Sequence, residues 1–189
     1  MFIFYKLFIL YIMLSKLFKT DKRIAILNYV LYNESTTITE ISKKTKVSKG
    51  LVSRFMKYLE ASELIEKRER KYFLVNNEIV KAIKKLLNLE RIKINANDTF
   101  WADAIGIYGS WASGTNTSES DLDIWIEIKK YPLEYEISKF HKNLRKTTQT
   151  EVNFLILTPE KLKSLKDTDK PFYNSIIRNT IILKGESFE

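Results

Sequence analysis

The chain contains no cysteine, a single histidine, only five glycines and only three prolines among its 189 residues. The lack of cysteine excludes disulfides, thiolate zinc sites and cysteine nucleophiles, and it is compatible with the reducing cytoplasm in which we expect the protein. So few glycines and prolines argue against long flexible linkers, and no internal repeat or low-complexity segment interrupts the chain. A hydrophobic fraction of 44% is ample for packed cores, and the length predicts one or two small domains.

Positive charge is concentrated in the first half of the chain. Residues 1–94 hold 20 Lys and Arg against 9 Asp and Glu, a net +11, whereas residues 95–189 carry −2. A strongly basic segment is typical of domains that bind polyanions. We therefore expect the first half to bind nucleic acid and the second half to carry any chemistry.

The first twelve residues, MFIFYKLFILYI, form an apolar run that Lys6 interrupts. The run is too short to span a bilayer, and it lacks the basic start and cleavage site of a signal peptide, so no membrane partner is expected. Met13 opens a stretch that reads as an ordinary protein start. We interpret residues 1–12 as an upstream extension; the alternative is a helix that packs on a partner or on a membrane surface.

The most informative stretch is GSWASGTNTSESDLD, residues 109–123, which lies between two hydrophobic runs. This pattern predicts a strand, a tight turn with a short helix, and a second strand. Asp121 and Asp123 are two residues apart on that strand, so they share a face, about 6–7 Å apart. Paired carboxylates suit Mg²⁺, and the backbone N–H groups at Gly109 and Ser110 are predicted to cradle phosphates. Together the two elements predict phosphoryl or nucleotidyl transfer.

These residues resemble the signature of the minimal nucleotidyltransferases of the DNA polymerase β superfamily, in which Gly-Ser is followed ten residues later by Asp-x-Asp. Gly109, Ser110, Asp121 and Asp123 fill all four positions, and the resemblance covers roughly residues 95–189. It implies a two-metal Mg²⁺ site and the transfer of an NMP, with ATP as the expected donor, to a macromolecule. The similarity to antitoxins of this type further implies an antitoxin-like role, with a HEPN-type toxin as one candidate acceptor.

The family carries a third carboxylate on the strand that follows the long helix, and the matching position here is Asn153. Glu151 is close in sequence but points to the opposite face under strict alternation. Three alternatives stay open: Asn153 acts as a neutral ligand, a bulge brings Glu151 into the site, or full activity is lost. The rival function is a DNA-binding transcriptional regulator whose second domain binds nucleotide without turnover.

Residues 22–75 show three helical patterns followed by two strand patterns. The helices are expected near 22–33, 37–44 and 49–62, and the two strands flank a charged turn. Thr37 and Glu40 form a capping-box pattern, and Ser48 is expected to cap the third helix. This order resembles a winged helix-turn-helix, which implies double-stranded DNA as partner and a homodimer that reads paired half-sites. The alternative is a packing or dimerisation module. The implied DNA contacts are Ser48, Lys49, Ser53, Arg54 and Lys57 on the third helix and Arg68, Arg70 and Lys71 on the hairpin.

We predict an α+β protein with three parts. A winged helix-turn-helix of three helices and a β-hairpin spans residues 13–76, a connecting helix spans 77–95, and a small mixed-sheet α/β nucleotidyltransferase domain spans 96–189. The connecting helix has an apolar stripe that is expected to pack on a neighbouring domain or a second subunit: Ile79, Val80, Ile83, Leu86 and Leu87.

The remainder of the second half predicts a helix near 133–146, a strand at 151–157, a helix that begins after Thr158, a helix at 170–180 and a last strand or tail at 181–183. Trp111 and Trp125 flank the motif and are expected in the core. His141 is expected on the surface.

Overall fold

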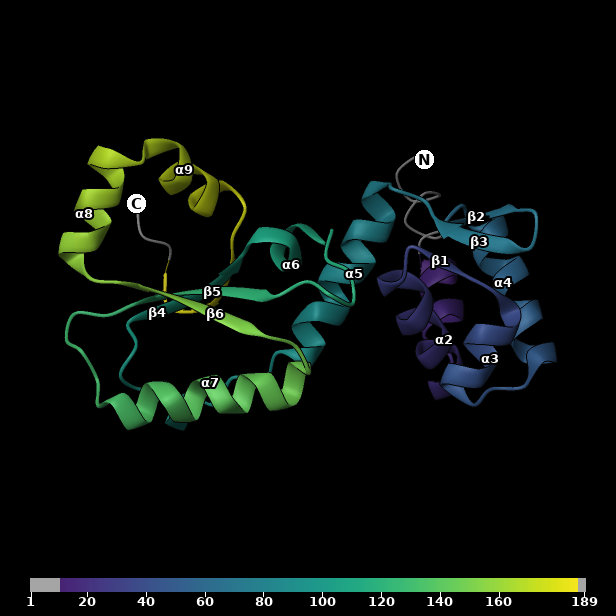
Figure 1. The fold of residues 1–189 in the computed structure, drawn as a ribbon, viewed down its shortest axis with the longest axis horizontal. Coiled ribbons are helices and arrows are strands. Elements are labelled where there is room, and N and C mark those ends of the chain that lie inside the picture. Colours follow the sequence, from purple (N-terminus) through teal and green to yellow (C-terminus); the bar gives the residue numbers. More distant parts are fainter. Residues whose placement is uncertain (1–10, 187–189) are drawn as a thin grey trace. The chain divides into compact units, whose positions relative to one another are not determined.

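The computed structural model describes residues 11–186. The chain divides into two compact units, residues 1–80 and 81–189, and the division falls within helix α5 (Glu78–Arg91). Figure 1 shows the elements of each unit. Residues 1–10, which hold most of the predicted upstream extension, lie outside the described residues. Within the described range, no helix is both long enough and apolar enough to cross a bilayer.

The first unit is a winged helix-turn-helix, as predicted. Residues 11–17 are helical, and three further helices and a small antiparallel sheet of order β1-β3-β2 follow. Its core is made of side chains spaced three or four residues apart on the helices, among them Leu27, Ile41, Val52 and Phe55. The elements are α2 (Asp21–Tyr32), β1 (Ser35–Thr36), α3 (Ile38–Thr45), α4 (Lys49–Ala61), β2 (Ile65–Arg68) and β3 (Lys71–Leu74).

The capping predictions for this unit have different outcomes. At the start of α3, Thr37 Oγ1 accepts a bond from the Glu40 N–H at 3.2 Å, and Glu40 Oε2 accepts one from the Thr37 N–H at 2.8 Å. The predicted capping box is therefore confirmed. Ser48 precedes α4, but its side chain makes no capping hydrogen bond, so that prediction is wrong. Its backbone carbonyl instead accepts from Leu51 and Val52, both at 3.0 Å.

The second unit is a mixed four-stranded sheet of order β6-β5-β4-β7, covered by helices on both faces (Figure 1). Strands β5 and β6 are parallel, and the other two pairings are antiparallel. The predicted mixed-sheet α/β fold is thus confirmed. After η1 (Ala96–Asp98), the elements are β4 (Ala104–Tyr108), α6 (Gly109–Ser113), β5 (Leu122–Glu127), α7 (Glu134–Thr148), β6 (Val152–Leu157), α8 (Pro159–Thr168), α9 (Lys170–Arg178) and β7 (Ile181–Lys184).

Alternating side chains of the sheet divide between two cores. Ile105 and Ile124 pack with Phe140 of α7, whereas Trp125 packs with Tyr173 of α9. Asp123 and Trp125 are two residues apart on β5, so both lie on the α8–α9 face. The acid pair therefore lies at the start of β5, on the face of the sheet that α8 and α9 cover.

Helix α5 buries three of the five apolar residues of its predicted stripe. Val80, Ile83 and Leu87 are buried, but Ile79 and Leu86 are 44% and 56% exposed. Three of the five apolar positions therefore pack within the chain, and the packing of Ile79 and Leu86 on a second subunit stays a prediction. Lys84 and Asn88 are buried on the same helix, at 4% and 0% exposure.

Candidate active site

The structure brings Asp121, Asp123 and Asn153 together at one end of the parallel β5–β6 pair. Asp123 lies in register with Asn153 across the two strands. The Asn153 side-chain N–H group donates to Asp123 Oδ1 at 3.1 Å and to Asp121 Oδ2 at 3.4 Å. Asp121 and Asn153 are exposed and Asp123 is half-buried, so all three are accessible to a ligand. An amide NH₂ with partial positive charge thus lies between two carboxylates.

The Gly-Ser turn lies directly beside this acid pair. Tyr108, the last residue of β4, is in register with Asp123, and Gly109 follows it with a φ of 68°. A Cβ atom at Gly109 would lie 2.8 Å from Asp123 Oδ2, so only glycine allows the backbone to approach the carboxylate this closely. Helix α6 starts here and ends at Gly114, whose φ is 72°. Burial raises the pKa of the Tyr108 hydroxyl, and the negative charge of Asp123 raises it further.

We expect Gly109→Ala to weaken both the fold and the site. A side chain in the left-handed conformation costs about 1–2 kcal/mol, and the new methyl group would displace the Asp123 carboxylate. Thermal denaturation and triphosphate affinity would measure the two effects. Gly50→Ala is the matched control, because a Cβ there meets nothing within 4 Å and Gly50 lies in helix α4. That change should stabilise the protein by about 1 kcal/mol and leave triphosphate affinity unaltered.

Two carboxylates and a carboxamide oxygen make a donor set that fits Mg²⁺, a hard cation that prefers oxygen ligands. Asn153 would join this set with Oδ1, which needs only a rotation about its terminal side-chain bond. In the described part of the chain, no three His, Asp or Glu residues form a group that could hold a metal. The acid pair is therefore supplemented by an amide and not by a third acid.

Glu151 does not enter this site. Strands β5 and β6 pair without interruption from Leu122 opposite Val152 to Glu127 opposite Leu157, so no bulge turns the chain. The Glu151 carboxylate forms an ion pair with Arg145 of α7. Of the alternatives left open by the sequence, the structure excludes the bulge.

His141 lies closer to the site than the sequence indicated. It is half-buried, its Nε2 lies 2.9 Å from the carbonyl oxygen of Val152, and its ring packs edge-on against Phe154 at 5.2 Å. Val152 and Phe154 flank Asn153 on β6. His141 thus remains at the surface, as predicted, but it also contacts β6. The spacing of a lone histidine on a polar helix gives no local signal for this contact.

Trp111 and Trp125 are buried at 1% and 0% exposure, which confirms their place in the core. Trp125 Nε1–H donates to Thr180 Oγ1 at 2.6 Å, and that hydroxyl donates to the Ile107 carbonyl at 3.0 Å. Trp111 Nε1–H donates to the Ser120 carbonyl at 3.3 Å. Both indoles therefore hold the strands and the loop of the site.

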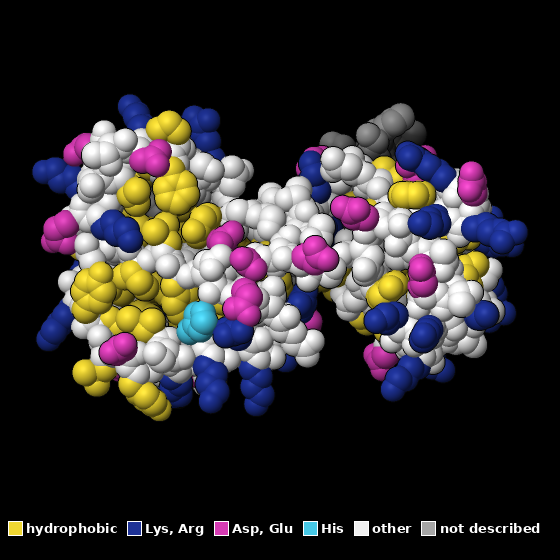
Figure 2. Space-filling view, in the orientation of Figure 1, with side chains coloured by type: hydrophobic (Ala, Val, Ile, Leu, Met, Phe, Trp, Pro, Cys, Tyr) yellow, Lys and Arg dark blue, Asp and Glu magenta, His cyan; other side chains and the backbone are white. Residues whose placement is uncertain are grey.

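The predicted DNA-contact residues lie on the surface of the first unit, where Lys and Arg side chains gather in the view of Figure 2. On β2, Arg68 is already paired with Glu66, and its guanidinium lies 5.2 Å from the centre of the Phe73 ring. Ser53 is half-buried. Seven are exposed: Ser48, Lys49, Arg54, Lys57, Arg68, Arg70 and Lys71.

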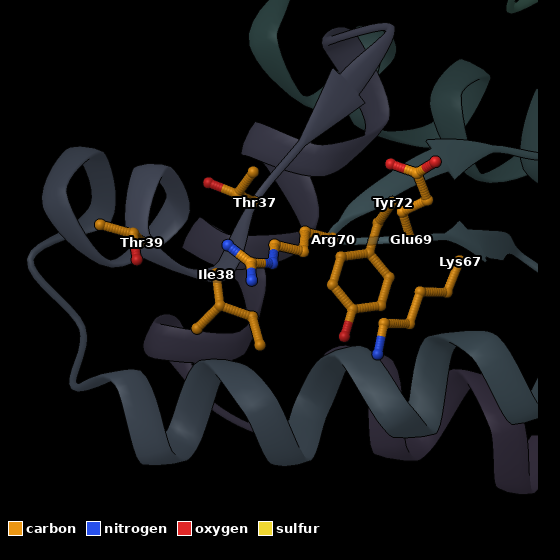
Figure 3. Close-up of a pocket in the computed structure, with 7 residues that line it drawn as sticks. All are labelled: Thr37, Ile38, Thr39, Lys67, Glu69, Arg70 and Tyr72. Carbon is orange, nitrogen blue, oxygen red and sulfur yellow. The ribbon is translucent and has the colours of Figure 1, made fainter.

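A pocket of about 380 Å³ lies between the hairpin and the start of α3. Figure 3 shows the Arg70 guanidinium reaching toward Thr37 and Ile38, and Lys67 extending alongside Tyr72. Lys67 Nζ lies 5.9 Å from the centre of the Tyr72 ring. Lys67 was not among the residues predicted to contact DNA, although it is one of six consecutive charged residues, 66–71.

Comparison with protein families identifies both units. The profile described as "Nucleotidyltransferase domain" matches residues 77–183, and the profile described as "MarR family" matches residues 20–71. The first profile thus includes the Gly-Ser turn, the acid pair and Asn153. The second includes the three helices and most of the hairpin.

No curated protein matches the chain, but several solved structures resemble it distantly. One is a complex of a tri-AMPylated Shewanella oneidensis HEPN toxin with an MNT antitoxin. The matched chain of that complex is 10% identical to this one, the match covers 56% of this chain and 73% of the other, and the TM-score is 0.33. A toxin–antitoxin with AMP-PNP is 17% identical, with coverages of 59% and 76% and a TM-score of 0.34. TrmBL2, an archaeal chromatin protein, is 15% identical, with coverages of 85% and 71% and a TM-score of 0.28.

Proposed function

Because the chain belongs to the nucleotidyltransferase domain family and also carries a MarR-family winged helix, we propose that it is a DNA-binding, Mg²⁺-dependent nucleotidyltransferase. It moves an NMP, with ATP as donor, to a macromolecular acceptor in the cytoplasm. In this proposal, residues 13–76 bind DNA, residues 77–95 connect, and residues 96–189 carry the transfer site.

The observation that carries the proposal is the convergence of the acid pair and the Gly-Ser turn. Gly109 has no side chain to separate its backbone from the Asp123 carboxylate, so a group held by the turn is also within reach of the acids. Asp121 and Asp123 would hold the cation, with Asn153 Oδ1 as a neutral third ligand. When bound, Mg²⁺ supplies positive charge that neutralises the charge developing on the phosphates.

The remaining roles fall to the chain itself. Backbone N–H groups at Gly109 and Ser110, and the Ser110 hydroxyl, bind the β- and γ-phosphates. This places the α-phosphorus beside the acid pair, where the acceptor hydroxyl attacks in line. The bond between the α-phosphorus and the oxygen that bridges the α- and β-phosphates breaks, and pyrophosphate leaves. The proton of the acceptor hydroxyl passes to solvent, because the Asn153 carboxamide has no basic site to accept it.

The first candidate acceptor is a hydroxyl side chain of a HEPN-type toxin, as the resemblance to minimal nucleotidyltransferase antitoxins implies. Such antitoxins are typically nucleotidyltransferase domains alone, whereas this chain adds a winged helix. A neighbouring gene for a HEPN protein would support the antitoxin-like role. The purified neighbour would then serve as the acceptor in the transfer assay.

Asn153 favours a second candidate function, a transcriptional regulator that binds nucleotide without turning it over. A carboxamide is neither charged nor appreciably basic, so it replaces the third carboxylate of the family poorly as metal ligand and as base. Under this alternative, Mg²⁺ and nucleotide bind at the same residues, and operator affinity responds to nucleotide.

One experiment separates the two functions. The protein is incubated with Mg²⁺ and ATP labelled on the α-phosphate, together with cell extract or a purified candidate acceptor. Label that becomes attached to a macromolecule, and is lost in an Asp121→Asn/Asp123→Asn variant, supports the transferase. Nucleotide binding without transfer, together with footprints at specific operators, supports the regulator. An absence of any Mg²⁺-dependent nucleotide binding contradicts both.

We propose that DNA is bound by α4 in the major groove and by the hairpin on the backbone, with two copies of the chain on paired half-sites. Size-exclusion chromatography with light scattering, with and without duplex, tests the dimer. Phosphate contacts from this surface give affinity that falls with salt.

Arg54→Ala is expected to weaken duplex binding uniformly across sequences and to reduce the slope of log K against log salt by about 0.9, as for one lost phosphate contact. Arg54 is exposed on α4, so the fold should be unaffected. Fluorescence anisotropy across a salt series measures the slope. Arg178→Ala, an exposed arginine in the second unit, is the control and should behave as wild type. An unchanged slope in Arg54→Ala would show that this face of α4 does not lie on DNA.

A further inference from the structure

A buried polar network joins α5 to the loop that follows the Gly-Ser turn. Asn88 Nδ2 donates to the Trp111 carbonyl at 2.9 Å and to Asn116 Oδ1 at 3.0 Å, and Asn116 Nδ2 donates back to Asn88 Oδ1 at 3.2 Å. The Lys84 ammonium donates to the Asn116 carbonyl. Lys84 is 4% exposed, and both asparagines are fully buried.

Burying these groups is unfavourable unless their bonds are made. Burial alone lowers the pKa of Lys84 to about 8, which reflects the cost of removing an ammonium group from water. A leucine at either α5 position would avoid that cost. Fully bonded polar networks of this kind hold a unique arrangement of the chain more strictly than apolar packing does.

The network acts on the turn through the backbone. The N–H groups of Thr115 and Asn116 both donate to the Ser110 carbonyl, at 2.9 and 3.2 Å. Asn116 is therefore tied to Ser110 by its backbone and to α5 by its side chain and its carbonyl. Gly114 completes the contact, because a Cβ there would lie 2.3 Å from the Lys81 carbonyl oxygen.

An arginine extends the same contact toward the C-terminal end of α5. The Arg91 guanidinium lies 4.8 Å from the centre of the Trp111 ring and donates to the Thr148 carbonyl at the end of α7. Trp111 is the residue after Ser110. Residues 110–116 are thus held from one side by a row of α5 side chains one turn apart.

We propose that Lys84, Asn88 and Asn116 are positioning residues that fix the Gly109–Ser110 turn in the conformation that binds a triphosphate. This inference rests on the proposed function, because it assigns the network to the phosphate-binding turn of that site. The network itself does not touch the phosphates. Its contribution is that the N–H groups of the turn are aligned before the ligand arrives.

The test uses full-length protein with two variants that remove the bonds but keep side-chain volume, Lys84→Met and Asn88→Leu. Calorimetry measures the affinity for inorganic tripolyphosphate with Mg²⁺, at a temperature where circular dichroism shows each variant to be folded. We expect both to bind about tenfold more weakly than wild type, as for the loss of one or two buried hydrogen bonds. Asn88→Ser, which leaves a hydroxyl and room for water, replaces Asn88→Leu if the latter does not fold.

Lys85→Met is the matched control, since Lys85 is the adjacent lysine on α5 and takes no part in the network. It should bind tripolyphosphate as wild type does. The kinetic signature is a higher KM for ATP in the two variants with a smaller change in kcat, because the acid pair is intact. A network that only stabilises the fold would lower the melting temperature and leave the affinity unchanged.

Two negative outcomes are distinguishable. If wild type binds tripolyphosphate and the folded variants bind it equally well, the positioning role is wrong and the proposed function stands. If wild type does not bind tripolyphosphate with Mg²⁺, both are wrong, because there is then no phosphate-binding turn to position.

Discussion

Replacing both Asp121 and Asp123 with asparagine is expected to reduce label transfer from ATP by at least about 10³-fold. The two carboxylates are the only charged groups that we assign to the cation, and both lie beside the Gly-Ser turn. Their loss removes the negative charge that holds Mg²⁺, while the backbone of the turn is unchanged. Mg²⁺-dependent binding of ATP should fall with transfer.

The fold should tolerate this double change. Asp121 is exposed and Asp123 half-buried, and asparagine keeps the shape of both side chains. Glu119→Gln is the control, because Glu119 is an exposed acid in the same loop. Transfer and Mg²⁺ affinity are measured on all three proteins, together with the melting temperature. Equal transfer by the double variant and wild type would show that the chemistry does not take place at the acid pair.

The acid pair and the turn could be predicted from the sequence because their signals are local. Two acids two residues apart on a strand share a face whatever the rest of the fold does, and a Gly-Ser pair between hydrophobic runs marks a turn. The capping box at Thr37 and Glu40 is equally local. In each case, the residues that carry the pattern are also the residues that form the contact.

The long-range contacts that surround the site could not be predicted in this way. Asn88 and Asn116 are 28 positions apart, and no periodicity relates them. On α5 the pattern shows where apolar residues recur, but it does not reveal that Lys84 and Asn88 are buried while Leu86 is exposed. His141 and Val152 likewise meet only because α7 packs beside β6. Contacts of this kind depend on the tertiary arrangement and leave no trace in local spacing.

The two-residue strand β1 shows the same limit in the first unit. Ser35 and Thr36 pair with Phe73 and Tyr72 of the hairpin. A strand this short has no alternation of its own, so its existence depends on β3 lying beside it. The hairpin itself, with two alternating segments around a charged turn, was recognisable.

Asn153→Asp is expected to lower stability without Mg²⁺ but not with Mg²⁺. In wild type the Asn153 amide donates to both acids, at 3.1 and 3.4 Å. Aspartate would remove both bonds and bring a third negative charge to the same place, so without Mg²⁺ the protein should lose about 1 kcal/mol of stability, since solvent screens these exposed groups. With Mg²⁺ the third carboxylate becomes a ligand, and the loss should be recovered.

Transfer by the same variant should rise about 10²-fold, because a carboxylate can accept the proton of the attacking hydroxyl, whereas a carboxamide cannot. Melting curves in EDTA and in Mg²⁺, and label transfer from ATP, measure the two effects. Asn97→Asp is the control, an exposed asparagine that gains the same charge away from the acid pair. A rise in Mg²⁺ affinity without transfer would favour the regulator. A melting temperature in EDTA equal to that of wild type would show that the amide does not lie between the two acids, and the donor set proposed for the cation would then be wrong.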